Sequence, residues 1–197
     1  MDAAALRAAF PVLARRAYLN AGTCGPLAAT AVRAATAALE RAATEGRSGA
    51  YSVATIEMRL RLRRAYADVL GTAPDDVALT TSTSEGIVRV LGALELDPGD
   101  EVLTSTEEHP GLLGPLAAAR AQRGLQIRAV PFEQLADAVS PATRLVACSH
   151  VSWVTGRVLP DLAGIDVPVL LDGAQGVGAV PVDLAALGCA FYAGSGQ

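Results

Sequence analysis

The chain has 197 residues, of which 51% are hydrophobic, and a formal net charge of -4. This length and hydrophobicity suffice for one sizeable buried core and exclude an intrinsically disordered chain. The charge is spread along the sequence, and the one local basic cluster lacks interleaved aromatic residues. That cluster is better explained as a solvated helix face than as a nucleic-acid patch, so we expect no nucleic-acid partner. It comprises Arg59, Arg61, Arg63 and Arg64.

Two sequence features bear on metal binding and targeting. Cys24, Cys148 and Cys189 are an odd number at unrelated spacings, so we expect neither disulfides nor a metal site. The N-terminal stretch 1–13 is alanine-rich and helical in pattern, but Asp2 and Arg7 interrupt it. It is predicted to be neither a secretory signal nor a membrane anchor. We therefore expect a cytoplasmic protein with no membrane partner.

Helical patterns and short apolar segments alternate along the chain. Pro26 suits the first turn of a helix that Gly46 ends, Gly71 closes the next helix, and residues 97–100 form a Pro-Gly turn. The pattern predicts an α/β fold with a mostly parallel sheet. In chain order we expect a helix at 26–45, a helix at 53–70, a strand at 77–81, a helix at 84–96, strands at 101–105 and 126–130 flanking a helix at 111–123, a helix at 132–139, and strands at 144–149 and 167–171.

Polar residues follow the predicted strands directly. The apolar run 167–171 is typical of a strand that is buried on both faces of a sheet. In such sheets ligands bind beyond the carboxyl ends of the strands, so the polar segments there are the candidate functional residues. These segments are 81–84, 107–109, 149–152 and 172–175.

Each of these segments has an ordinary structural interpretation beside a functional one. The hydroxyl-rich turn 80–84 either caps a helix or holds a phosphate at a helix N-terminus. His109 is either a surface residue or a group that stacks on an aromatic ring or moves protons, whereas His150 is predicted to be structural. Asp172 either forms a turn or meets a cationic ligand group, because a buried carboxylate is costly alone.

Taken in order, these segments resemble the class V aminotransferase family of fold-type I pyridoxal phosphate (PLP) enzymes. That family includes cysteine desulfurases, kynureninase-like lyases and isopenicillin epimerase-like proteins. The resemblance runs along nearly the whole chain. It is carried by residues 18–26, 81–85, 108–109, 149–156, 172–178, 182–183 and 195–196.

The resemblance implies a role for each matching residue. Asp172 would keep the pyridine nitrogen of PLP protonated, Gln175 would donate to the ring 3-oxygen, and His109 would stack on the ring. Asp172 and His109 would therefore be the catalytic residues of this chain. The phosphate would be held by Thr83, Ser84 and Ser195, with Gln197 also beside the cofactor. Residues on the substrate side would be Asn20, Gly22 and Thr23.

The resemblance also implies an architecture. We expect an N-terminal helix and substrate-side loop at 1–25 and an incomplete PLP-binding large domain at 26–197, with three α/β/α layers. The chain contains 16 Lys and Arg residues, and all of them are arginines. The lysine that forms a Schiff base with PLP is expected at position 198. The small C-terminal domain and an interior antiparallel strand would follow it. Without that strand, residues 77–81 and the strand near Phe191 would be unpaired edges, and we expect poor stability in isolation.

Two departures from the family pattern bear on function. Trp153 occupies a position where desulfurase-like relatives usually carry Asn, and Ala190 a position where relatives usually carry Asp. We expect an enzyme acting on a small-molecule amino acid, by a carbon–sulfur lyase or desulfurase-type reaction, that is inactive as this chain alone. An aminotransferase or epimerase of the same family, and a non-catalytic remnant or partner-binding fragment, are the alternatives. The full-length relative is expected to be a homodimer.

Overall fold

The computed structural model describes residues 2–162 and 164–196. The chain forms two compact units, one extending to Arg63 and the other comprising Arg64–Gly196. The first unit contains α1 (Ala3–Ala9), the 3-10 turn η1 (Pro11–Ala14) and α2 (Ala29–Glu45). Helix α3 (Gly49–Leu70) begins in the first unit and ends in the second. The predicted domain boundary after residue 25 stays a prediction.

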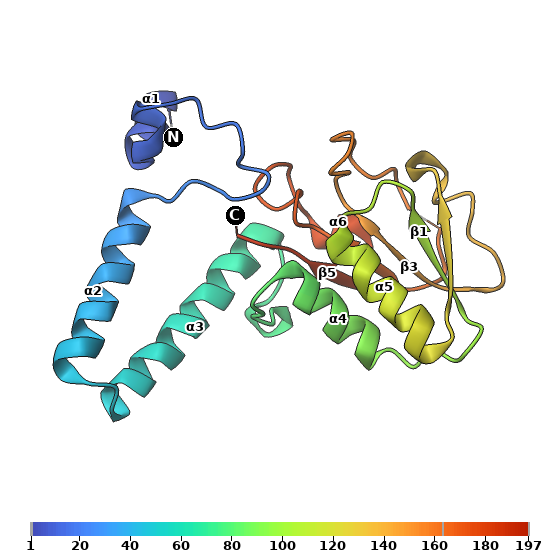
Figure 1. The fold of residues 1–197 in the computed structure, drawn as a ribbon, viewed down its shortest axis with the longest axis horizontal. Helices are drawn as coiled ribbons and strands as arrows, with labels where there is room; N and C mark the ends of the chain where they lie inside the picture. The colour runs from blue at the N-terminus through green and yellow to red at the C-terminus, as the bar shows by residue number, and fades with distance from the viewer. Residues whose placement is uncertain (1, 163, 197) are drawn as a thin grey trace. The chain divides into compact units, whose positions relative to one another are not determined.

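The second unit is built on a five-stranded sheet in which all neighbouring strands are parallel. The strands are β1 (Glu101–Ser105), β2 (Gln126–Val130), β3 (Thr143–Ser149), β4 (Val169–Asp172) and β5 (Phe191–Ala193), in the order β2-β1-β3-β4-β5. Helices α4 (Thr83–Ala93) and α5 (Pro110–Arg123) lie side by side against it (Figure 1). This arrangement confirms the predicted α/β fold with a mostly parallel sheet.

Strands β1, β3 and β4 are largely buried on both faces because alternate residues enter two separate core clusters. On one face Val102, Leu145 and Leu170 pack with Ile87 of α4 and Leu116 of α5. On the other face, strand residues pack against the connecting segments, in a cluster that comprises Leu103, Phe132, Leu135, Val146, Cys148, Val169 and Leu171. The short helix α6 (Leu184–Leu187) contributes Leu187 to this second face.

Most predicted elements match the structure within a few residues, and two do not. The predicted strand at 77–81 is wrong: this stretch follows the 3-10 turn η2 (Pro74–Asp76) without strand pairing in the described part of the chain. It lines a groove opposite β5, so it has no neighbouring strand with which to form a ladder. The predicted helix at 132–139 is also wrong, because only the 3-10 turn η3 (Phe132–Gln134) forms, and Phe132 and Leu135 are used to cover the sheet.

Helix α4 ends at Ala93, three residues before the predicted end, and an arginine from α5 binds carbonyl oxygens in its last turn and just beyond it. The guanidinium of the half-buried Arg123 donates to the carbonyl oxygens of Leu91, Leu94 and Leu96, the last two at 2.8 and 3.0 Å. Helix ends leave such carbonyls without intrahelical partners. Arg123 therefore joins the two helices that cover one face of the sheet.

None of the helices among residues 2–162 and 164–196 is long and apolar enough to cross a membrane.

The Arg123 contacts generate a stability prediction. Arg123→Ala should lower the free energy of unfolding by about 1–3 kcal/mol, because it leaves part-buried carbonyls unsatisfied. Urea denaturation followed by far-UV circular dichroism measures this change. Arg120→Ala is the matched control, since Arg120 is exposed on the same helix and should change stability by less than about 0.5 kcal/mol. Equal effects of the two substitutions would contradict the capping role of Arg123.

Candidate functional site

The carboxyl ends of β1, β3 and β4 lie together at one edge of the sheet. Ser149, the last residue of β3, is the register partner of Asp172, the last residue of β4. A buried carboxyl joins these ends to β1: Glu108, only 4% exposed, accepts hydrogen bonds from the hydroxyls of Ser105 and Ser149, the latter at 2.5 Å. Burial raises the pKa of Glu108, and the two hydroxyls offset part of that rise.

His109 follows Glu108 and forms the N-cap of α5. Its Nδ1 accepts a hydrogen bond from the backbone N–H of Gly111 at 2.9 Å. A Cβ added to Gly111 would lie 2.7 Å from Ser84 Oγ and 2.9 Å from His109 Nδ1. The side chains of Ser84 and His109 therefore meet where the N-termini of α4 and α5 converge.

The indole of Trp153 stands edge-on to the His109 ring. The ring centroids are 5.0 Å apart and the planes meet at 85°. Trp153 is about half exposed and lies in the connection that follows β3. It belongs to the predicted strand-end segment as a departure from the family pattern, but its contact with His109 was not predicted.

Asp172 is 5% exposed at the end of β4. Its Oδ1 accepts the backbone N–H of Ala174 at 3.0 Å. Burial raises the pKa of Asp172, whereas the Ala174 N–H and the nearby His109 lower it. A Cβ at Gly173 would lie 2.1 Å from the ring of Tyr192, so only glycine fits between Asp172 and this ring.

The N-terminus of α4 is fixed by its own first turn. Ser82 is the N-cap, and its hydroxyl accepts the Glu85 N–H at 3.1 Å. The Glu85 carboxylate accepts the hydroxyl and backbone N–H of Thr81 and pairs with Arg89, which lowers the pKa of Glu85 to about 2. The capping interpretation of this turn is thereby confirmed, while Thr83 and Ser84, the first two residues of the helix, keep backbone N–H groups that intrahelical bonds cannot satisfy.

A groove of about 720 Å³ runs between α4, the 77–83 segment and the residues that follow β5. Thr83 and Ser195 both line it. Ser195 Oγ is buried and has no hydrogen-bond partner among the described residues. The hydroxyl of Ser195 is therefore available to a polar ligand atom in the groove, whereas the other such hydroxyl in the described part of the chain, that of Thr104, lies within β1. Thr83 and Ser195 thus share one hollow, at the positively polarised end of α4.

The remaining predicted site residues that the structure describes lie in turns of the two compact units. Gln175 is half-buried in the turn after Asp172, where the N–H groups of Gly176 and Val177 donate to Gly173 O. Asn20, Gly22 and Thr23 belong to the first unit, where Asn20 O accepts the N–H of Thr23 in a tight turn. Gln197 lies outside the described residues.

His150 is buried and its Nδ1 lies 3.0 Å from the Tyr192 hydroxyl, which supports its structural interpretation.

Sequence reasoning assigned no role to Glu107 or Glu108, although both lie in a predicted strand-end segment. Apart from Ser105, which lies three residues before Glu108, their side-chain partners are 41 to 50 residues away in sequence, so no local pattern reveals them. Two adjacent acidic residues directly after an apolar strand were the available signal. Within the described residues no cluster of three or more His, Cys, Asp or Glu side chains could hold a metal ion.

Comparison with known proteins identifies the family. The sequence model of the family described as Aminotransferase class-V matches residues 17–197. The chain is 31% identical to a probable cysteine desulfurase of Methanothermobacter thermautotrophicus, with 98% of this chain and 52% of the relative covered. It is also 31% identical to the isopenicillin N epimerase of Amycolatopsis lactamdurans, covering 91% of this chain and 50% of that protein. The chain belongs to the class V aminotransferase family.

Solved structures agree with this assignment. The fold matches C-DES, described as a cystine C-S lyase, in a complex with its reaction product cysteine persulfide and in a variant with glycine covalently linked to its PLP cofactor. Both comparisons give a TM-score of 0.88 at 32% identity, and they cover 97% and 95% of this chain but 55% of C-DES. The chain therefore spans about half the length of the relatives it matches, and the predicted family resemblance is confirmed.

The buried Glu108 gives a pH-dependent prediction. Its pKa is raised above 4.5 by folding, so the unfolded chain releases this proton first, and ionisation costs stability as the pH rises above about 4.5. Glu108→Gln keeps a group that can bond both serines but does not ionise. The unfolding free energy of the wild type should therefore fall relative to Glu108→Gln between about pH 4.5 and the raised pKa. Parallel pH profiles in urea titrations of the two proteins would contradict this.

Proposed function

We propose that this chain supplies the PLP-binding part of an enzyme that acts on a small-molecule amino acid by a carbon–sulfur lyase or desulfurase-type reaction. The observation that carries the proposal is the buried carboxylate of Asp172 beside His109, at the same sheet edge as the N-termini of α4 and α5. A cationic aromatic ring with an attached phosphate is complementary to this arrangement. The membership of the chain in the class V aminotransferase family supports the same cofactor.

The residues fit PLP on two independent grounds. A buried carboxylate is costly unless a cation meets it, and a protonated pyridine nitrogen is a cation of the right shape for Asp172. The orphaned hydroxyl of Ser195 and the N-terminus of α4 supply neutral donors for a phosphate, and both border the same groove. The small residues after Asp172 allow a flat ring to approach the backbone.

When bound, PLP withdraws electrons from the α-carbon of an amino-acid substrate. Asp172 would hold the proton on the ring nitrogen, because a carboxylate favours the charged form of its partner. His109 would stack on the ring and limit its movement. Thr83, Ser84 and Ser195 would hold the phosphate, and Gln175 and Gln197 would be further contacts to the cofactor.

The covalent attachment of PLP to a lysine cannot be provided by residues 1–197, because all 16 of their Lys and Arg positions are arginine. We therefore infer that this chain alone binds the cofactor without catalysing a reaction. Asn20, Gly22 and Thr23 are proposed to face the substrate, and the full-length enzyme is proposed to be a homodimer.

Epimerisation is the second candidate, and the relationship to the isopenicillin N epimerase supports it. The two reactions differ in which bond of the substrate breaks. A lyase or desulfurase releases sulfur from a cysteine-derived amino acid, whereas an epimerase exchanges only the α-proton. Assays of the full-length enzyme for persulfide formation from cystine, read as sulfide after reduction by an added thiol, and for α-deuterium exchange without persulfide formation, separate the two.

The cofactor proposal is tested by replacing Asp172. Asp172→Asn keeps an oxygen for the Ala174 N–H but removes the charge, and it should weaken PLP binding by about 10-fold or more. Trp153 is the one tryptophan of the chain, so quenching of its fluorescence by added PLP measures the affinity.

The matched control is Asp183→Asn, because Asp183 Oδ1 also accepts backbone N–H groups, those of Ala185 and Ala186 at the start of α6. This substitution should leave the affinity for PLP unchanged. Equal affinities of the wild type and Asp172→Asn would contradict the proposed role of Asp172.

A further inference from the structure

After β3 the chain folds back on itself in a short hairpin, residues 151–158. Val151 and Val158 form an antiparallel bridge, and the Ser152 N–H donates to Arg157 O at 2.8 Å. The turn closes through Gly156, whose φ of +73° suits glycine and whose N–H donates to Ser152 O. This 151–158 hairpin presents Trp153 and Val154, which are 49% and 61% exposed.

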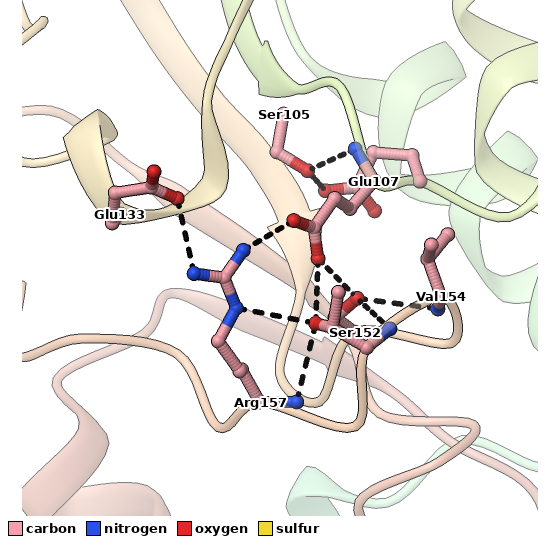
Figure 2. Close-up of polar contacts among 8 residues, drawn as sticks. Ser105, Glu107, Glu133, Ser152, Val154 and Arg157 are labelled. Atoms are coloured by element: carbon pink, nitrogen blue, oxygen red, sulfur yellow. Dashed lines mark hydrogen bonds and ion pairs between the residues drawn. The ribbon is translucent and has the colours of Figure 1, made fainter.

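A single carboxylate, that of Glu107, ties the hairpin to the segment that follows β1 (Figure 2). Glu107 accepts hydrogen bonds from the hydroxyls of Ser152 at 2.5 Å and Thr155 at 2.8 Å, and its other oxygen pairs with Arg157. Arg157 also donates to Thr155 Oγ1 at 3.2 Å and lies 3.4 Å from Glu133. The Ser152 and Thr155 hydroxyls, followed by Arg157, lower the pKa of Glu107, which keeps this anchor charged.

The contacts of Glu107 also bear on the position of the His109 ring relative to Trp153. Glu107 stands two residues before His109, and Trp153 follows Ser152 directly. The Glu107 contacts thus hold the two backbone segments that carry the His109 and Trp153 rings, whose centroids are 5.0 Å apart in edge-to-face geometry. Because half of the indole is exposed, its place depends on the hairpin as well as on its own packing.

We propose that Trp153 is a positioning residue that fixes the plane of the His109 ring, and that the Glu107–Arg157 pair holds the hairpin in the place where Trp153 can do so. This inference rests on the proposed function, because the positioned ring is the one that would stack on PLP. Trp153 acts through His109 and is not itself assigned a contact with the cofactor. The competing explanation is that the hairpin tip is ordinary exposed surface.

The first experiment needs no cofactor. Since Trp153 is the one tryptophan of the chain, the long-wavelength tryptophan bands of the near-ultraviolet circular dichroism and the emission maximum on selective tryptophan excitation report on this ring, apart from the bands of the four tyrosines. Arg157→Gln and Glu107→Gln should each diminish the tryptophan dichroism and shift the emission to longer wavelength, because the hairpin is released. His109→Ala should also change both signals.

The matched control is Arg144→Gln. Arg144 is 53% exposed and pairs with Asp100 at 3.7 Å, while Arg157 is 49% exposed, so the two substitutions remove arginines of comparable exposure that each pair with an acidic residue. Arg144→Gln should leave the spectra of Trp153 as in the wild type. If Arg157→Gln and Glu107→Gln also leave them unchanged, the hairpin tie does not position Trp153 and the proposal is overturned.

The second experiment is a double-mutant cycle on PLP binding, measured by equilibrium dialysis. Trp153→Ala should weaken binding by about 3- to 10-fold, the size expected for one aromatic pair, and Trp153→Phe should retain most of the affinity. In a His109→Ala background, Trp153→Ala should have no further effect, because the residue through which it acts is gone. Equal losses in both backgrounds would show that Trp153 does not act through His109.

The two proposals fail in different ways. Absence of PLP binding by the wild type contradicts the proposed function, whereas the cofactor-free spectra still decide whether the hairpin positions Trp153 against His109. Far-UV circular dichroism of each variant verifies that it is folded. Normal PLP binding by the wild type together with unaltered binding by Trp153→Ala overturns the positioning role alone.

Discussion

The parallel pairing of β1, β3 and β4 is the constraint on which the site depends. Parallel strands end at the same edge of a sheet, so the polar residues that follow them are brought together although they lie far apart in sequence. Glu108 strengthens this arrangement because its buried carboxyl bonds the hydroxyls of Ser105 and Ser149 across two strand ends. The carboxyl is costly to bury, and the two hydroxyls make its burial tolerable.

The two-sided core explains why these strand ends are held rigidly. Alternate residues of β1, β3 and β4 enter separate clusters, one under α4 and α5 and the other under the 132–139 segment and α6. Helices α4 and α5 are joined through Arg123, and their N-termini converge beside Ser84 and His109. The same packing that buries the sheet therefore places two helix N-termini at the edge where Asp172 ends β4. A negatively charged ligand group is favoured there by both helices.

Local sequence pattern is sufficient to predict several strands and helices. The strands at 101–105 and 126–130 were predicted with their observed bounds, because each is a short apolar run between a turn signal and a helix pattern. The stretch 77–81 has the same pattern but forms no strand, since a ladder needs a neighbour and its nearest strand, β5, lies across a groove. The composition of a segment does not show whether a neighbouring strand is present to pair with it.

The candidate site likewise contains some residues whose positions can be predicted from the sequence and some contacts that cannot. Ser84, His109 and Asp172 follow or precede recognisable elements, so their convergence was predictable from topology. The contacts of Glu107 and Trp153, and the contact of Glu108 with Ser149, were not, because they join side chains more than 40 residues apart that no periodicity relates. What Asn20, Gly22 and Thr23 do also stays a prediction, as they belong to the other compact unit.

A crystal structure of this chain with PLP tests the central claim most directly. The account predicts that the pyridine nitrogen lies within hydrogen-bond distance of the Asp172 carboxylate, with the phosphate at the N-terminus of α4 beside Thr83, Ser84 and Ser195. A cofactor bound elsewhere, or one whose phosphate lies away from α4 and whose ring does not contact His109, would contradict it.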